Sequence, residues 1–119
     1  MTLSIYHNPR CSKSRKTLEI IESHGLQPRI VEYLENPPDP DTLRGLADML
    51  GVPLADLLRR SEADFAEADQ PVPVDDSLAL SQWLHAHPRV LQRPIVVDDD
   101  AGRAVVGRPP ENVLELIGG

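Results

Sequence analysis

Two short apolar runs and the helical pattern between them define the beginning of the chain. Leu3–Tyr6 is apolar enough for a strand, and the β-branched and aromatic side chains of Arg29–Leu34 predict a second strand. The intervening pattern predicts a helix from about Ser12 to His24, which Gly25 ends as a C-cap. A strand, a helix and a strand in so short a segment predict a right-handed βαβ unit with parallel strands.

The middle of the chain carries the spacing of helices. Leu43, Leu46, Ala47 and Leu50 repeat at intervals that place them on one face of a helix. This helix is preceded by Asp39-Pro40, an N-cap residue followed by the proline that helices tolerate in their first turn. The further elements expected here are a helix beginning at Pro53 and ending at Arg59 and Arg60, a polar, acidic surface loop over Ser61–Asp76, and a helix over Ser77–His87.

The C-terminal part of the chain predicts a hairpin and a final helix. Pro94–Val97 and Arg103–Val106 are apolar runs that predict two strands, and Asp98–Gly102 between them is typical of a tight turn. A helix is expected over Glu111–Ile117. The predicted fold is therefore α/β, a mixed four-stranded sheet flanked by helices, with a helical insertion over about residues 39–90 between the second and third strands.

Composition and charge narrow the class of protein. At 119 residues, the chain is expected to form a single domain over residues 1–119 with a core of its own. It has no apolar run of membrane-spanning length and no signal-peptide pattern, so we expect no membrane partner. The net charge of −7 argues against nucleic acid as a partner. The single cysteine excludes an internal disulfide and favours a reducing, cytoplasmic location.

That cysteine, Cys11, lies in a basic segment of this acidic chain. It follows the turn residues Asn8-Pro9 and precedes the first expected helix, so it sits at or beside a helix N-terminus, where unpaired N–H groups favour negative charge. The basic residues around it are His7, Arg10, Lys13, Arg15 and Lys16. Such surroundings lower the pKa of a thiol below its free value of about 8.5, so Cys11 is a candidate thiolate nucleophile beside an anion site.

Other interpretations of these residues fit less well. A buried structural cysteine is expected among apolar neighbours, but nothing apolar lies between Pro9 and Thr17. A phosphate-binding loop of the G-x-x-x-x-G-K-[ST] type needs glycines, which positions 7–17 lack. No metal site is expected either, because His85 and His87 are two residues apart in a predicted helix and point in different directions.

Four segments together resemble the glutaredoxin-coupled arsenate reductases. They are Tyr6–Arg15, which contains the motif His-Asn-Pro-x-Cys, together with Leu57–Arg59, Gln92–Val97 and Arg108-Pro109. The likeness covers nearly the whole chain. The order of elements, with a reactive cysteine between the first strand and the first helix, is similar to that of the thioredoxin fold. In that fold a cis proline precedes the strand that faces the cysteine, and the resemblance places Pro94 there.

The resemblance also implies roles for five residues. The family's catalytic cysteine and nearby histidine are matched by Cys11 and His7, and its three oxyanion-holding arginines are matched by Arg59, Arg93 and Arg108. The resemblance therefore gives Arg59 a role in oxyanion binding, in place of the role at a helix C-terminus that its position alone would suggest. Guanidinium groups suit arsenate, because they bind tetrahedral oxyanions through paired hydrogen bonds and stay charged at all working pH values. A protonated His7 would add to the positive field around the thiolate.

Two functions remain as alternatives. The first is an arsenate reductase that uses arsenate as substrate, glutathione as co-substrate and glutaredoxin as partner, with no bound cofactor. The second is a thiol-stress transcriptional regulator of similar fold, which binds RNA polymerase and reduces nothing. Such regulators usually carry a second cysteine three positions after the first, where this chain has Ser14, and the arginines would have no role in them. Phosphatase-like arsenate reductases are excluded, because their Cys-x-x-x-x-x-Arg motif would require arginine at Thr17.

Overall fold

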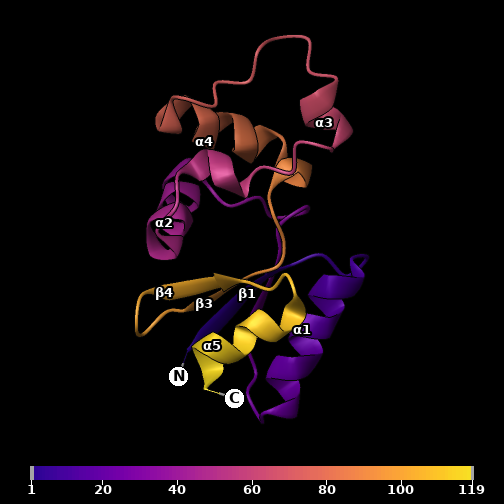
Figure 1. The fold of residues 1–119 in the computed structure, drawn as a ribbon, viewed down its shortest axis with the longest axis vertical. Coiled ribbons are helices and arrows are strands. Elements are labelled where there is room, and N and C mark those ends of the chain that lie inside the picture. The colour runs from indigo at the N-terminus through magenta and orange to yellow at the C-terminus, as the bar shows by residue number, and fades with distance from the viewer. Residues whose placement is uncertain (1, 119) are drawn as a thin grey trace. The chain divides into compact units, whose positions relative to one another are not determined.

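The first and last parts of the chain together form a four-stranded mixed sheet (Figure 1). In this computed structural model, which describes residues 2–118, the strand order is β2-β1-β3-β4. The strands are β1 (Leu3–His7), β2 (Arg29–Glu32), β3 (Ile95–Asp98) and β4 (Arg103–Val106). β1 pairs in parallel with β2 and antiparallel with β3, and β3 pairs antiparallel with β4. The predicted α/β class with a mixed four-stranded sheet is confirmed.

A helix between β1 and β2 makes the crossover that parallel strands require. This helix, α1 (Ser12–Ser23), is followed by Gly25, whose φ of +74° favours a residue without a side chain. The Gly25 N–H donates to the Glu22 carbonyl at 3.0 Å and closes the last turn. The strand register places His7 opposite Glu32, so the carboxyl ends of β1 and β2 lie at the same edge of the sheet.

One apolar core joins the sheet to the helices of this part of the chain. Leu3 and Ile5 alternate along β1 and meet Val96 of the neighbouring strand β3 on one face of the sheet. The buried residues of the core are Leu3, Ile5, Ile21, Val96, Val113 and Leu116. Because Ile21 anchors α1 to this core, the loop between β1 and α1, which carries Cys11, has two fixed ends.

The C-terminal helix differs in detail from the prediction. The chain forms a 3₁₀ turn, η3 (Pro110–Val113), before the α-helical turn α5 (Leu114–Ile117). The Asn112 side-chain amide donates to the carbonyls of Val106 and Arg108, at 3.3 and 3.1 Å. These bonds tie the start of η3 to the end of β4, which favours the tighter 3₁₀ geometry that is frequent at helix termini.

The segment between β2 and β3 is built around two packed helices. α2 (Pro40–Leu50) begins as predicted, because the Asp39 side chain accepts a hydrogen bond from the Thr42 N–H at 2.8 Å. It ends at Gly51 in the left-handed conformation, with φ of +70°. α4 (Ser77–Ala86) packs against α2. The buried leucines of the two helices are Leu43, Leu46, Leu80 and Leu84.

Two details of this segment correct the sequence prediction. The turn after Pro53 is a short 3₁₀ helix, η1 (Leu54–Leu57), and Arg59 lies beyond its end, where its N–H donates to the Val90 carbonyl at 2.6 Å. Arg59 therefore does not complement a helix terminus. The predicted loop also contains one helical turn, α3 (Ala63–Ala66).

That turn is held by aromatic contacts which the local pattern does not reveal. Phe65 packs edge-to-face on Trp83 of α4, with ring centroids 6.2 Å apart. The Arg60 guanidinium lies 5.4 Å from the centre of the Phe65 ring, which gives Arg60 a structural role.

The chain thus forms two compact units. One comprises the residues up to Asn36 and from Arg93 onward, and the other is Pro37–Gln92, close to the predicted insertion over residues 39–90. That the two act as a single domain stays a prediction. Among residues 2–118, no helix has both the length and the apolar character needed to cross a membrane.

Candidate functional site

Cys11 occupies the N-cap position of α1. Its φ and ψ of −94° and 122° are extended, and its N–H donates to the Asn8 carbonyl at 3.0 Å, which closes the turn after β1. The Asn8 side-chain oxygen accepts from the Arg10 N–H at 3.0 Å and rigidifies the same turn. The thiol is only partly exposed. The loop therefore presents one reactive sulfur at the positive end of a helix.

The surroundings of Cys11 favour its thiolate form. Burial alone would raise the pKa of the thiol, but the Ser14 N–H, the Arg93 guanidinium and the Lys13 N–H outweigh burial and leave the pKa of Cys11 lowered. The Cys11 side chain makes no capping hydrogen bond to the first turn of α1. These three groups instead act together as neighbouring donors that stabilise the thiolate. A partly exposed thiolate next to a guanidinium can attack an electrophilic centre that carries anionic oxygens.

His7 supports the loop as a neutral side chain. Burial lowers the pKa of His7 and Arg15 adds to the effect, although Glu32 and Glu22 oppose it. The His7 Nδ1 lies 2.6 Å from the Ser14 Oγ, which also accepts the Asn8 N–H at 3.1 Å. We infer that the Ser14 hydroxyl donates its proton to the imidazole. The lowered pKa disfavours the protonated form of His7 that would add to the positive field around the thiolate, and Ser14 is a residue that sequence reasoning did not assign to the site.

Arg93 and Arg108 lie in the same unit as Cys11. Arg93 precedes β3 through a cis bond to Pro94, as the resemblance implies, and its guanidinium interacts with the Cys11 sulfur. Arg108 follows β4, and its side chain donates to the Arg93 carbonyl at 3.1 Å. The bond between Arg108 and Pro109 is also cis, which the sequence did not predict. Two of the three predicted arginines are thus connected to each other, and one of them contacts the thiol.

Arg59 belongs to the other compact unit. Its Nη1 atom is buried and has no hydrogen-bond partner within residues 2–118. A buried guanidinium N–H without an acceptor is costly, so such a donor is suited to a ligand that brings its own acceptor. The convergence of Arg59 on Cys11 remains a prediction.

Sequence reasoning also missed Tyr33. It was expected in β2, but β2 ends at Glu32 and Tyr33 begins the following turn, with its side chain 0% exposed. The side chain interacts with Arg93, Cys11 and Asn8. The signal that could have located it is topological, because residues after the carboxyl ends of parallel strands meet at one sheet edge.

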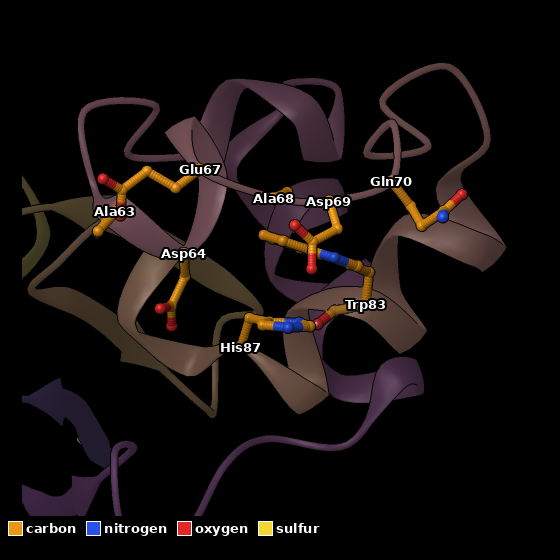
Figure 2. Close-up of a pocket in the computed structure, with 8 residues that line it drawn as sticks. All are labelled: Ala63, Asp64, Glu67, Ala68, Asp69, Gln70, Trp83 and His87. Carbon is orange, nitrogen blue, oxygen red and sulfur yellow. The ribbon is translucent and has the colours of Figure 1, made fainter.

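A pocket in the other unit has the wrong chemistry for an anion (Figure 2). It is lined by the carboxylates of Asp64, Glu67 and Asp69, which would repel an oxyanion. On its other side, Trp83 and His87 stack with ring centroids 4.2 Å apart. The His87 Nδ1 is engaged with the Trp83 carbonyl at 2.8 Å. Within residues 2–118, no group of three or more His, Cys, Asp or Glu side chains is arranged so that it could hold a metal ion.

Comparison with known proteins gives one consistent family. Residues 6–116 match the ArsC family. A protein of Escherichia coli K12, named as uncharacterized protein YfgD, is 46% identical over 98% of this chain and 97% of its own length. An arsenate reductase of Neisseria meningitidis serogroup A is 40% identical over 97% of each chain. The solved structure of an arsenate reductase from Vibrio cholerae has a TM-score of 0.85 at 40% identity, over 97% of each chain.

Proposed function

The chain belongs to the ArsC family, and on this premise we propose that it is an arsenate reductase whose nucleophile is Cys11. The observation that carries the assignment is the lowered pKa of Cys11 at the N-terminus of α1 beside Arg93. A thiolate there has both the charge to attack arsenic and neighbours that attract an anion. Because the whole chain has a net charge of −7, the basic segment around Cys11 is the favoured place for an anionic substrate.

Arginine side chains are proposed to hold the substrate. Arg93 and Arg108 supply donors from adjacent loops of one unit, and Arg59 would supply a third set. Paired N–H groups match the geometry of a tetrahedral oxyanion and neutralise its charge. They also stabilise the negative charge on the arsenate oxygens as the sulfur attacks. His7, held neutral against Ser14, keeps the loop of Cys11 in position.

The proposed chemistry has two bond exchanges. The Cys11 thiolate forms a sulfur–arsenic bond while one arsenate oxygen takes up protons and leaves as water. A glutathione thiolate then attacks the Cys11 sulfur, so that a disulfide forms and the electron pair of the sulfur–arsenic bond stays on arsenic. Arsenic(V) becomes arsenic(III), released as arsenite, and Cys11 is left bonded to glutathione. Glutaredoxin would remove the glutathione by thiol exchange, which requires a reducing compartment such as the cytoplasm.

The direct test is arsenate-dependent oxidation of glutathione in the presence of glutaredoxin. We expect turnover with the wild type and none with Cys11→Ser. Arg93→Ala should lower kcat/KM by at least about tenfold, equivalent to about 1.4 kcal/mol of transition-state stabilisation. Arg59→Ala should have a comparable effect, whereas Arg60→Ala is the matched control, because Arg60 stacks on Phe65. Equal effects at the two neighbouring arginines would refute the assignment of Arg59.

A further inference from the structure

The side chain of Tyr33 lies at the edge of the sheet from which the catalytic loop begins. β1 and β2 are parallel and in register, with His7 opposite Glu32, so the next residues along the two strands, Asn8 and Tyr33, leave the sheet side by side. Cys11 lies one turn beyond Asn8. The backbone thus brings Tyr33 to the site through the pairing of β1 with β2.

The Tyr33 hydroxyl is a buried donor that the protein does not use. The whole side chain is 0% exposed, and its oxygen has no hydrogen-bond partner in the described part of the chain. Of its polar neighbours, the Arg93 guanidinium can only donate, so it cannot accept the phenol proton. The Asn8 side chain lowers the pKa of the phenol, as a donor does and an acceptor of the phenol proton does not, and its oxygen accepts the Arg10 N–H at 3.0 Å. A phenylalanine would fill the same space without leaving a polar group unsatisfied.

We propose that Tyr33 is a substrate-binding residue whose hydroxyl donates a hydrogen bond to an oxygen of the oxyanion bound over Cys11. This inference rests on the proposed function, which supplies the oxyanion. A bound arsenate brings acceptor oxygens into a space where this chain has mostly donors. A neutral donor adds a directional contact to the charged arginine contacts and helps to fix which oxygen faces away from the attacking sulfur.

The ionisation of Tyr33 is consistent with a donor role. Burial raises the pKa of the phenol, while Arg93 lowers it and the negative Cys11 sulfur raises it further, so that the pKa remains above its ordinary value. The phenol therefore stays protonated at neutral pH and serves as a hydrogen-bond donor rather than as a general acid.

The test measures arsenate binding without turnover. Wild type and Tyr33→Phe are alkylated at Cys11 with iodoacetamide in the absence of glutathione. Arsenate is added as the competing ligand. We expect Tyr33→Phe to need about tenfold more arsenate for half-protection, as for loss of a hydrogen bond to a charged acceptor.

Two further readouts separate this role from a structural one. The melting temperature of Tyr33→Phe should equal or exceed that of the wild type, because the substitution removes an unsatisfied hydroxyl. The pH midpoint of Cys11 alkylation without arsenate should be unchanged. Unaltered protection by arsenate, a lower melting temperature, or a shifted midpoint with normal protection would each overturn the inference. Absence of protection in the wild type would instead refute the proposed function, and the inference with it.

Discussion

At the scale of single residues, the site is a cluster of hydrogen-bond donors around one sulfur. The Ser14 and Lys13 N–H groups and the Arg93 guanidinium are directed at Cys11, and the Tyr33 hydroxyl is buried without a partner. A site made of donors is complete only when an anion occupies it. The thiolate is the anion that the chain itself provides, and the substrate oxygens would be the second.

The thiol of Cys11 should therefore ionise at unusually low pH. Because its pKa is lowered in the folded protein, we expect the rate of alkylation to rise with an inflection below about 8.5, the value of a free thiol. The folded state favours the thiolate, so this contribution to stability is present above the unfolded pKa and is lost as pH falls through the folded pKa. The urea-denatured protein is the reference, and an inflection at or above its value would contradict an activated thiolate.

The sequence predicted which residues form the site better than it predicted their charge and their hydrogen bonds. Cys11 at a helix N-terminus and Arg93 before a cis proline both follow from short sequence segments and the family resemblance. The charge of His7 could not be predicted, because it depends on burial in β1 and on a bond to Ser14 seven residues away. Tyr33 was missed for a similar reason, since its aromatic ring fits a strand pattern equally well whether its hydroxyl is used or not.

At the scale of elements, the end of β4 is locked against the start of β3 and against α1. The Gly107 N–H donates to the Pro94 carbonyl at 2.9 Å. A Cβ atom at Gly107 would lie 2.5 Å from the Thr17 Oγ1 and 2.8 Å from the Pro94 Cγ, which is too close for either neighbour. Gly107 therefore permits the close approach that places Arg108 beside Arg93.

Substitution of Gly107 should damage both stability and the site. We expect Gly107→Ala to lower the free energy of unfolding by about 1–3 kcal/mol, as overpacking does, and to reduce arsenate turnover through displacement of Arg108. Urea unfolding and the reductase assay measure the two effects. Gly45→Ala is the matched control, because Gly45 lies in α2 with nothing within 4 Å of an added Cβ. It should be neutral or stabilising by up to about 1 kcal/mol. Similar losses in both variants would argue against the close contact.

Element boundaries follow from sequence where one residue type dictates the backbone. Asp39 with Pro40 begins α2 as predicted, and Gly51 ends it, because side-chain capping and a left-handed φ are local requirements. The 3₁₀ turns η1 and η3 were expected as α-helix, since the choice depends on distant partners such as the carbonyl of Val106. The helical turn α3 likewise depends on the packing of Phe65 on Trp83.

At the scale of the whole molecule, the electron count determines which partners are needed. Reduction of arsenic(V) to arsenic(III) takes two electrons, and thiols supply them by forming a disulfide. The chain has one cysteine, so Cys11 cannot form that disulfide internally. The second thiol must come from another molecule. A small thiol suits the proposed site better than a protein, because Cys11 is only partly exposed and the glutathione carboxylates would be attracted to the arginines.

Glutathione and glutaredoxin should therefore sustain turnover, whereas thioredoxin alone should not. We expect a reaction with arsenate and glutathione but no glutaredoxin to stop with one glutathione on Cys11, because nothing then clears the mixed disulfide efficiently. Intact-protein mass spectrometry of wild type and Cys11→Ser would detect this adduct in the wild type only. Addition of glutaredoxin should remove the adduct and restore arsenite release. Multiple turnovers with thioredoxin and no small thiol would refute this scheme, because they would show that a protein thiol resolves the Cys11 intermediate directly.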